Sequence, residues 1–166
     1  MTRLLPLLLI LGVWIASPTH AQTSDAMQPF AAHAGDWEGD GWAAAGAGDR
    51  ETFTAQVSLR PALNGRALIM EGSGHDRAML AVLTHDADAD TYAVQAFTAD
   101  GTPVGAEVEL VDGALQWTYS DANGRMIRWT ERFTDDGTWV RTGEVSPDSG
   151  ARWIPISEIT LRRAGA

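Results

Sequence analysis

The chain has 166 residues and a formal net charge of −10 at pH 7, and its 12 basic residues are all arginines. An acidic chain repels phosphate backbones, so nucleic acid and anionic membrane surfaces are poor partners for it. The sequence contains no cysteine. Disulfides, a lipid-anchor cysteine and a thiolate nucleophile are therefore excluded, and stability must come from packing. The length suits one domain with a core large enough to fold alone.

The first 21 residues have the layout of a secretory signal peptide. Arg3 supplies a short positive region, residues 4–15 form an apolar run, and Thr19 and Ala21 are small residues placed for a cut after Ala21. The run is short for a membrane span, and an uncleaved N-terminal anchor is the alternative. We expect a periplasmic or secreted protein that begins at Gln22, with no membrane span after signal removal. Loss of the one charge on Arg3 takes the net charge from −10 to −11.

Residues 22–34 resemble a polar leader with one short helical turn near Pro29, since proline is favoured at a helix start. From residue 35 to 163, segments of alternating polarity are separated by turns rich in glycine, asparagine and aspartate. Period-two alternation over so many segments indicates strands. Ten strands are expected, over residues 37–44, 51–59, 65–72, 79–85, 91–98, 104–111, 114–120, 125–134, 138–145 and 152–163. Residues 164–166 form a tail.

Ten short strands joined by tight turns predict an all-β fold. An antiparallel up-and-down barrel accounts best for the pattern, because closing the sheet removes its exposed edges. A two-sheet sandwich is the alternative.

The stretch GDWEGDGW, residues 35–42, combines three glycines, three carboxylates and two tryptophans. On a strand, Trp37, Gly39 and Gly41 share one face. Glycine weakens a strand interior, so alternate glycines indicate a sharp bend in the first strand of a barrel. We expect Trp37 to plug one barrel end, and the carboxylates of this stretch then need no catalytic role.

The pattern Gly35-x-Trp37-x-Gly39-x-Gly41 resembles the opening of the nitrobindins. These belong to the calycin superfamily, together with lipocalins, fatty-acid-binding proteins and avidins. The stretches NGRALIMEGSG, LAVLTHDADADTYAV, RWTERFTDDGTW and SEITLRR are similar to a family of bacterial secreted, lipocalin-like proteins classed as a domain of unknown function. The resemblance spans residues 35–163 and implies a barrel of about ten strands with a central cavity, but no settled activity. It also implies that Arg163 of the last strand stacks on Trp37 and closes the barrel.

No cofactor and no metal site are expected. The DADAD turn, residues 86–90, has calcium-loop spacing, but Thr91 stands where glycine is needed and Phe97 where glutamate is needed. His75 and His85 lie near opposite ends of one strand, which is too far apart for a shared metal. Nitrobindins hold haem through a histidine on a late strand, and no histidine follows His85 in this chain.

The candidate ligand-binding residues lie in the C-terminal half. Fatty-acid-binding proteins hold a carboxylate with late-strand arginines inside the barrel. This resemblance implies that Arg128, together with Glu158, is a candidate pair for ligand binding, since both lie in the matching stretches. The alternation also permits Arg128 and Arg132 to point outward, which would leave an apolar lumen. The candidates are Trp117, Arg128, Trp129, Phe133 and Glu158.

Three functions are compatible with the sequence. The first is binding of a small, partly hydrophobic molecule or carboxylate, and the second is a filled barrel that acts as a structural or interaction module. The third is an enzyme that uses a carboxylate such as Glu71, Glu131, Glu144 or Glu158, although no G-x-S-x-G elbow is present. Glu131 falls on an apolar face, where a carboxylate needs a partner or a raised pKa. An open lumen would favour the binder, and a buried Glu131 lining an open cavity would favour the enzyme.

Overall fold

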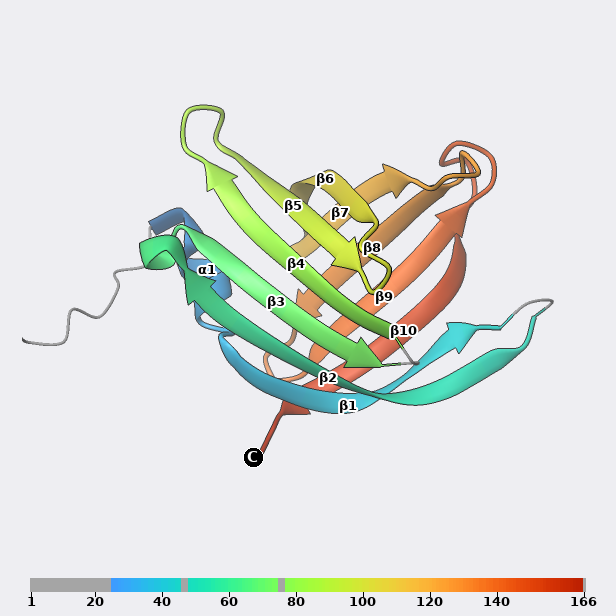
Figure 1. Cartoon of the computed structure of the whole chain (residues 1–166), viewed down its shortest axis with the longest axis horizontal. Coiled ribbons are helices and arrows are strands. Elements are labelled where there is room, and N and C mark those ends of the chain that lie inside the picture. Colours follow the sequence, from blue (N-terminus) through green and yellow to red (C-terminus); the bar gives the residue numbers. More distant parts are fainter. Residues whose placement is uncertain (1–24, 46–47, 75–76, 166) are drawn as a thin grey trace, which may run out of the picture.

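The computed structural model describes residues 25–45, 48–74 and 77–165, so the expected signal peptide and its cut site lie outside the described residues. Ten strands form one closed antiparallel barrel, in which consecutive strands pair and the first strand also pairs with the last (Figure 1). The predicted fold class is confirmed, and the sandwich is excluded. The strands are β1 (Gly35–Ala44), β2 (Arg50–Ala62), β3 (Ala67–Gly74), β4 (Arg77–Asp86), β5 (Thr91–Thr98), β6 (Pro103–Val111), β7 (Ala114–Ser120), β8 (Met126–Phe133), β9 (Trp139–Ser146) and β10 (Ile154–Arg163).

A short helical segment precedes β1 and covers one end of the barrel (Figure 1). It consists of the 3-10 turn η1 (Asp25–Met27) and the single turn α1 (Gln28–Ala31), which has Pro29 in its first turn. Met27 and Phe30 are buried in the main core. We call this the closed end of the barrel, and the opposite end, where β1 connects to β2, the open end.

Most strand boundaries differ from the predictions by one to three residues, and the late starts of β3 and β10 have local reasons. β3 begins at Ala67 rather than residue 65, because the 3-10 turn η2 (Leu63–Gly65) includes Asn64 and Gly65 with positive φ values of 55° and 78°. β10 begins at Ile154 rather than residue 152. The preceding turn is held by Asp148, whose Oδ1 accepts hydrogen bonds from the Ser146 hydroxyl and the Arg152 backbone N–H.

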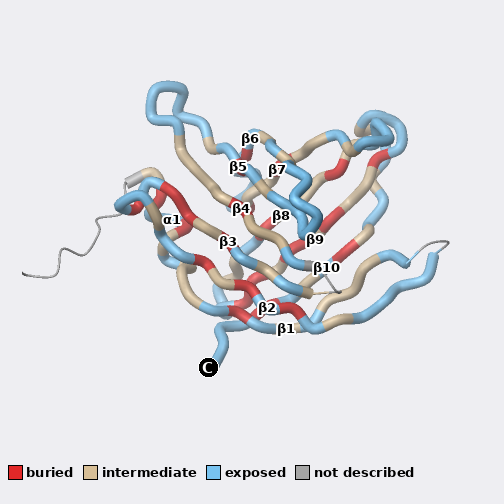
Figure 2. The backbone as a smooth tube through the Cα atoms, viewed as in Figure 1, coloured by how far each residue is buried: buried red, intermediate tan, exposed pale blue. Residues whose placement is uncertain are grey.

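The glycines of β1 allow the first and last strands to approach closely. A Cβ at Gly39 would collide with the Thr160 carbonyl oxygen, and one at Gly41 would lie 2.7 Å from the Glu158 carbonyl oxygen. Real Cβ atoms do not approach backbone oxygens this closely. Buried and less buried positions alternate along the strands, as Figure 2 shows for β2 and β9.

Trp37 and Arg163 form the closing contact between β1 and β10. The Trp37 side chain is 3% exposed, and the Arg163 guanidinium carbon lies 4.8 Å from the Trp37 ring centroid. Arg163 also donates hydrogen bonds to the carbonyl oxygens of Ala34 (2.8 Å) and Ala32 (3.0 Å). The indole N–H of Trp37 donates to the His33 carbonyl oxygen at 3.0 Å. The expected contact is therefore present, and it also fastens the segment between α1 and β1.

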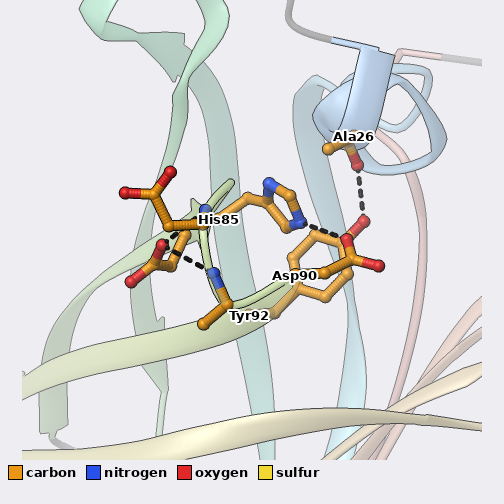
Figure 3. Close-up of polar contacts among 7 residues, drawn as sticks. Ala26, His85, Asp90 and Tyr92 are labelled. Carbon is orange, nitrogen blue, oxygen red and sulfur yellow. Dashed lines mark hydrogen bonds and ion pairs between the residues drawn. The ribbon is translucent and has the colours of Figure 1, made fainter.

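Tyr92 fastens the helical segment from the other side of the closed end. Its hydroxyl donates to the Ala26 carbonyl oxygen at 2.8 Å (Figure 3). Its ring meets Phe30 edge to face at a centroid distance of 5.1 Å. Next to it, His85 Nε2 lies 3.0 Å from Asp90 Oδ1 in the DADAD turn. Asp86 Oδ1 accepts two backbone N–H groups of that turn, so the segment is an exposed turn held by its own first carboxylate.

Replacing Tyr92 with phenylalanine is expected to lower the free energy of unfolding by about 1 kcal/mol, because the Ala26 carbonyl loses its partner. Denaturant melts measure the change. The matched control is Tyr119→Phe, since the Tyr119 hydroxyl makes no hydrogen bond within the described residues. Equal losses in the two variants would contradict the role assigned to the Tyr92 hydroxyl.

Candidate functional site

Two arginine–glutamate pairs lie directly across the β8–β9 ladder. Arg128 is opposite Glu144, and Glu131 is opposite Arg141. Positions 128 and 131 are three residues apart, and successive side chains of a strand point to opposite faces. One pair therefore lies on the outer surface of the barrel and the other lies inside it.

The outer pair is half-buried and well aligned. Arg128 Nε and Nη2 donate to Glu144 Oε2 at 2.9 and 2.7 Å, and the guanidinium lies 4.0 Å from the Trp153 ring centroid. The sequence left the direction of Arg128 open, and the structure places it outside with Glu144, rather than Glu158, as its partner. Glu158 is exposed on β10. On β8, the side chains of Ile127 and Trp129 point into the barrel, so Arg128 between them points outward.

The inner pair is almost sealed from solvent. Glu131 is 3% exposed and Arg141 is 6% exposed. The Trp139 indole N–H donates to Glu131 Oε2 at 2.6 Å. Arg141 Nε lies 3.1 Å from Glu131 Oε1, but the two are not aligned, and neither atom makes a hydrogen bond. Burial raises the pKa of Glu131, while the Arg141 charge and the Trp139 N–H act in the opposite direction.

The Arg141 guanidinium contacts two tryptophan rings and a methionine sulfur atom. Its carbon lies 4.5 Å from the Trp129 ring centroid and 5.9 Å from that of Trp117. Nη2 lies 3.6 Å from Met79 Sδ, which is a weak acceptor. Nη1 makes no hydrogen bond within the described part of the chain. Arg141 therefore has spare donor capacity in the interior of the barrel.

Gly143 positions the ring that supports Arg141. It is the cross-strand partner of Trp129, and a Cβ at this position would lie 2.7 Å from the Trp129 ring. Because Gly143 has no side chain, the Trp129 indole lies against β9 at this position, next to the guanidinium of Arg141 on the same strand. Trp129 and Met79 are half-buried, so this side of Arg141 faces the open half of the barrel.

A small cavity of about 50 Å³ lies on the closed side of the inner pair. Its lining residues are aliphatic or aromatic except for Glu131, and include Phe30, Ala81 and Trp117. One water needs roughly 10–15 Å³, so the cavity admits a few water-sized groups. It is much smaller than the roughly 300–1,000 Å³ of pockets that enclose a whole drug-sized ligand.

A larger hollow of about 430 Å³ lies on the outer face of β1–β3 and is lined by Asp36, Glu38 and Glu71. These carboxylates are exposed, and Asp36 already pairs with Arg60 at 2.7 Å. The described residues contain no group of three or more side chains placed to hold a metal ion. The hollow lacks the buried, incompletely paired polar groups of the lumen, so the lumen is the stronger candidate site.

The structure brings together part of the predicted set. Trp117 and Phe133 line the closed-end cavity, and Trp129 supports Arg141. Phe133 also stacks on His33 at a centroid distance of 3.6 Å. Arg128 and Glu158 lie outside the lumen. Arg141 was missed as a site residue, although its place in the alternation of β9, between inward Trp139 and Gly143, is the signal that finds it.

No family model matches the chain, and no curated protein matches it either. The structure establishes the class of fold, a closed ten-stranded antiparallel barrel, which is compatible with a calycin-like architecture. Within the described ranges, no helix has both the length and the apolar character that a membrane span requires.

Proposed function

We propose that the barrel binds a small, partly apolar ligand whose anionic or acceptor group meets Arg141. The observation that carries this proposal is a guanidinium held among aromatic rings in the lumen with an unsatisfied Nε and an unused Nη1. Placing an arginine in a protein interior costs several kcal/mol unless its donors are well paired. A barrel selected only for a filled core would gain more from an apolar residue at this position.

The dimensions of the lumen limit the size of the ligand. The closed-end cavity takes only a few heavy atoms and Arg141 does not line it, so we place the ligand's anionic group on the other side of the inner pair, beside Trp129 and Met79. A carboxylate with a short aliphatic chain or one ring has the required chemistry. We use hexanoate as the probe, with hexanamide as its uncharged counterpart.

Hexanoate is expected to bind the wild-type protein, and at least tenfold more weakly to the Glu131→Gln/Arg141→Met variant, which lacks the guanidinium but contains no unpaired buried charge. Isothermal titration calorimetry measures both affinities. The matched control is Arg128→Met, which removes the outer arginine of the same ladder and should bind as the wild type does. Equal affinity of wild type and double variant, or a preference for hexanamide, would contradict the proposal.

A carboxylate-dependent enzyme is the second candidate. It is favoured by one observation, namely that Glu131 lines the cavity and burial raises its pKa, as a general acid requires. In an enzyme, Glu131→Gln would abolish turnover while ligand binding persists. Native mass spectrometry of protein purified from its own host identifies the retained molecule. Incubating that molecule with the protein then distinguishes the candidates, since a binder leaves its mass unchanged and an enzyme converts it to a product.

We also propose that the protein is exported, to the periplasm or the medium, and that it belongs with the bacterial secreted lipocalin-like proteins. The first 21 residues support export, and the motifs of residues 35–163 support the family. N-terminal sequencing of the exported protein should give Gln22 as the first residue. A start at Met1 in that compartment would contradict cleavage.

A further inference from the structure

We propose that ligand binding is coupled to proton uptake by Glu131: the ligand's anionic group replaces this carboxylate as the partner of Arg141, and the carboxylate then takes a proton. The inference rests on the proposed function and concerns the same site. It begins from the imperfect contact between Arg141 Nε and Glu131 Oε1, which are 3.1 Å apart without a hydrogen bond. A partner that aligns with the guanidinium has little to displace.

Both groups have other supports that hold them when their mutual contact is lost. Glu131 keeps its short hydrogen bond from Trp139, which fixes the carboxyl through Oε2. Arg141 keeps its position over the Trp129 ring. The exchange therefore requires a small rotation of the guanidinium toward the open half, and no rearrangement of β8 or β9.

The charge balance explains why a proton must follow. In the free protein, one carboxylate and one guanidinium compensate each other. After an anion has bound Arg141, an ionised Glu131 would be an extra negative charge in an apolar setting, at a cost of several kcal/mol. One proton from solvent, added to Oε1, neutralises it. The ligand anion and Arg141 then form the ion pair, and up to one proton is taken up for each ligand bound.

No other group of the described lumen is placed to supply that charge or that proton. The strands packed against Glu131 present apolar side chains from β2 to β7, and Arg141 is the cation that faces it, from β9. Tyr92 and His33 lie at the closed end, where Tyr92 bonds Ala26 and His33 stacks on Phe133. Tyr119 lies at the open end of β7. Burial already raises the pKa of Glu131 while Arg141 is beside it, so loss of that neighbour raises it further.

The test is calorimetric titration of the full mature chain with hexanoate at one pH, in buffers with different ionisation enthalpies. The slope of the observed enthalpy against the buffer enthalpy gives the number of protons taken up. We expect uptake that approaches one proton per hexanoate in the wild type. Its affinity should then fall as the pH rises, with a slope set by the number of protons taken up.

Two variants test whether the proton is taken up by the glutamate of the inner pair or by that of the outer pair. Glu131→Gln should bind hexanoate at least tenfold more tightly, with no proton uptake and no pH dependence, because Arg141 has no competing anion. Glu144→Gln removes the glutamate of the outer pair and should keep the wild-type proton number. If Glu131→Gln does not fold, the infrared difference spectrum of the wild type with ¹³C-carboxyl hexanoate decides, since a protonated protein carboxyl band must appear on binding.

The outcomes separate this inference from the proposed function. Hexanoate binding at the Arg141 site with no proton uptake, or with no new carboxyl band, overturns the inference and leaves the proposed function intact. Failure of hexanoate to bind the wild type and both variants overturns both. Proton uptake that persists in Glu131→Gln assigns the proton to another group and overturns the inference alone.

Discussion

Trp37→Ala is expected to lower the free energy of unfolding by about 3–5 kcal/mol, as other deletions of a large buried aromatic side chain do. The ring is buried at the closed end, with Trp139 edge to face at 5.6 Å and Arg163 above it. Arg163→Ala should cost less, about 1–2 kcal/mol, since it removes one cation–π contact and two exposed hydrogen bonds. The two losses should not add, because the groups touch. Denaturant melts of the two single variants and the double variant measure all three quantities.

The carboxylates of the same stretch provide the control for this prediction. Glu38→Gln and Asp40→Asn should each change stability by less than about 0.5 kcal/mol, since both side chains are exposed. Hexanoate binding should also survive these changes. If the variants keep full stability and lose binding, the GDWEGDGW stretch is a functional site, and its interpretation as a closing strand is incomplete.

The second large effect is expected for Arg141→Met, which should cost about 3–5 kcal/mol because Glu131 loses its cation in the core and must either stay charged there or take up a proton. The double variant Glu131→Gln/Arg141→Met should recover most of that loss, since the neutral amide introduced by Glu131→Gln still accepts from the Trp139 N–H. The outer pair gives the comparison, and Arg128→Met should cost about 1 kcal/mol or less. Equal costs for Arg141→Met and Arg128→Met would contradict the burial of the inner pair.

The pH dependence of the Arg141→Met loss has a defined sign. Burial raises the pKa of Glu131 above its ordinary value of 4.5, so the folded state binds a proton more tightly than the unfolded chain does. Stability therefore falls as the pH rises above that value, because ionisation of Glu131 favours the unfolded state. In Arg141→Met no cation opposes this effect, so the stability gap to the wild type should widen from pH 4 to pH 8. Melts at several pH values measure the gap, and one that narrows over this range would contradict the assignment.

Much of the barrel could be predicted from the sequence, because period-two alternation and turn residues are local signals. The inward faces of Phe53, Val57 and Leu59, and of Trp117 and Trp129, follow directly from alternation. The contact of Arg163 with Trp37 was expected only from the resemblance to lipocalin-like barrels, since barrel closure joins the first and last strands without specifying which side chains meet. The start of β3 could not be predicted, because Asn64 and Gly65 form a 3-10 turn where the alternation predicts a strand.

The candidate site was less predictable because it depends on register. An arginine in a strand is most often solvated, and alternation on β9 only places Arg141 on the same face as Trp139, without distinguishing a paired inner arginine from an unpaired one. The distinction arises only when β8 and β9 are paired so that Glu131 is opposite Arg141 and Trp129 is opposite Gly143. That register is set by the turn at residues 134–137, where Thr134 and Asp136 bond the backbone of Thr138. Pairing across a turn is a non-local property that single-strand patterns do not contain.

The junction of β1 with β10 makes the order of synthesis important for folding. Arg163 donates a hydrogen bond to the backbone carbonyl of Ala34, 129 residues earlier in the chain. The glycines of β1 leave room for the backbone of β10, which is the last strand to be synthesised. A chain that emerges from its N-terminus exposes β1 as an unpaired edge until β10 arrives, and such long-range closure is slow. The exposed carboxylates of β1 discourage pairing with other chains during this interval, as charges on edge strands do. A nascent chain cut just before β10 keeps the β1 edge unpaired although the other strands are present, and despite these carboxylates it should be the truncated species most prone to aggregation.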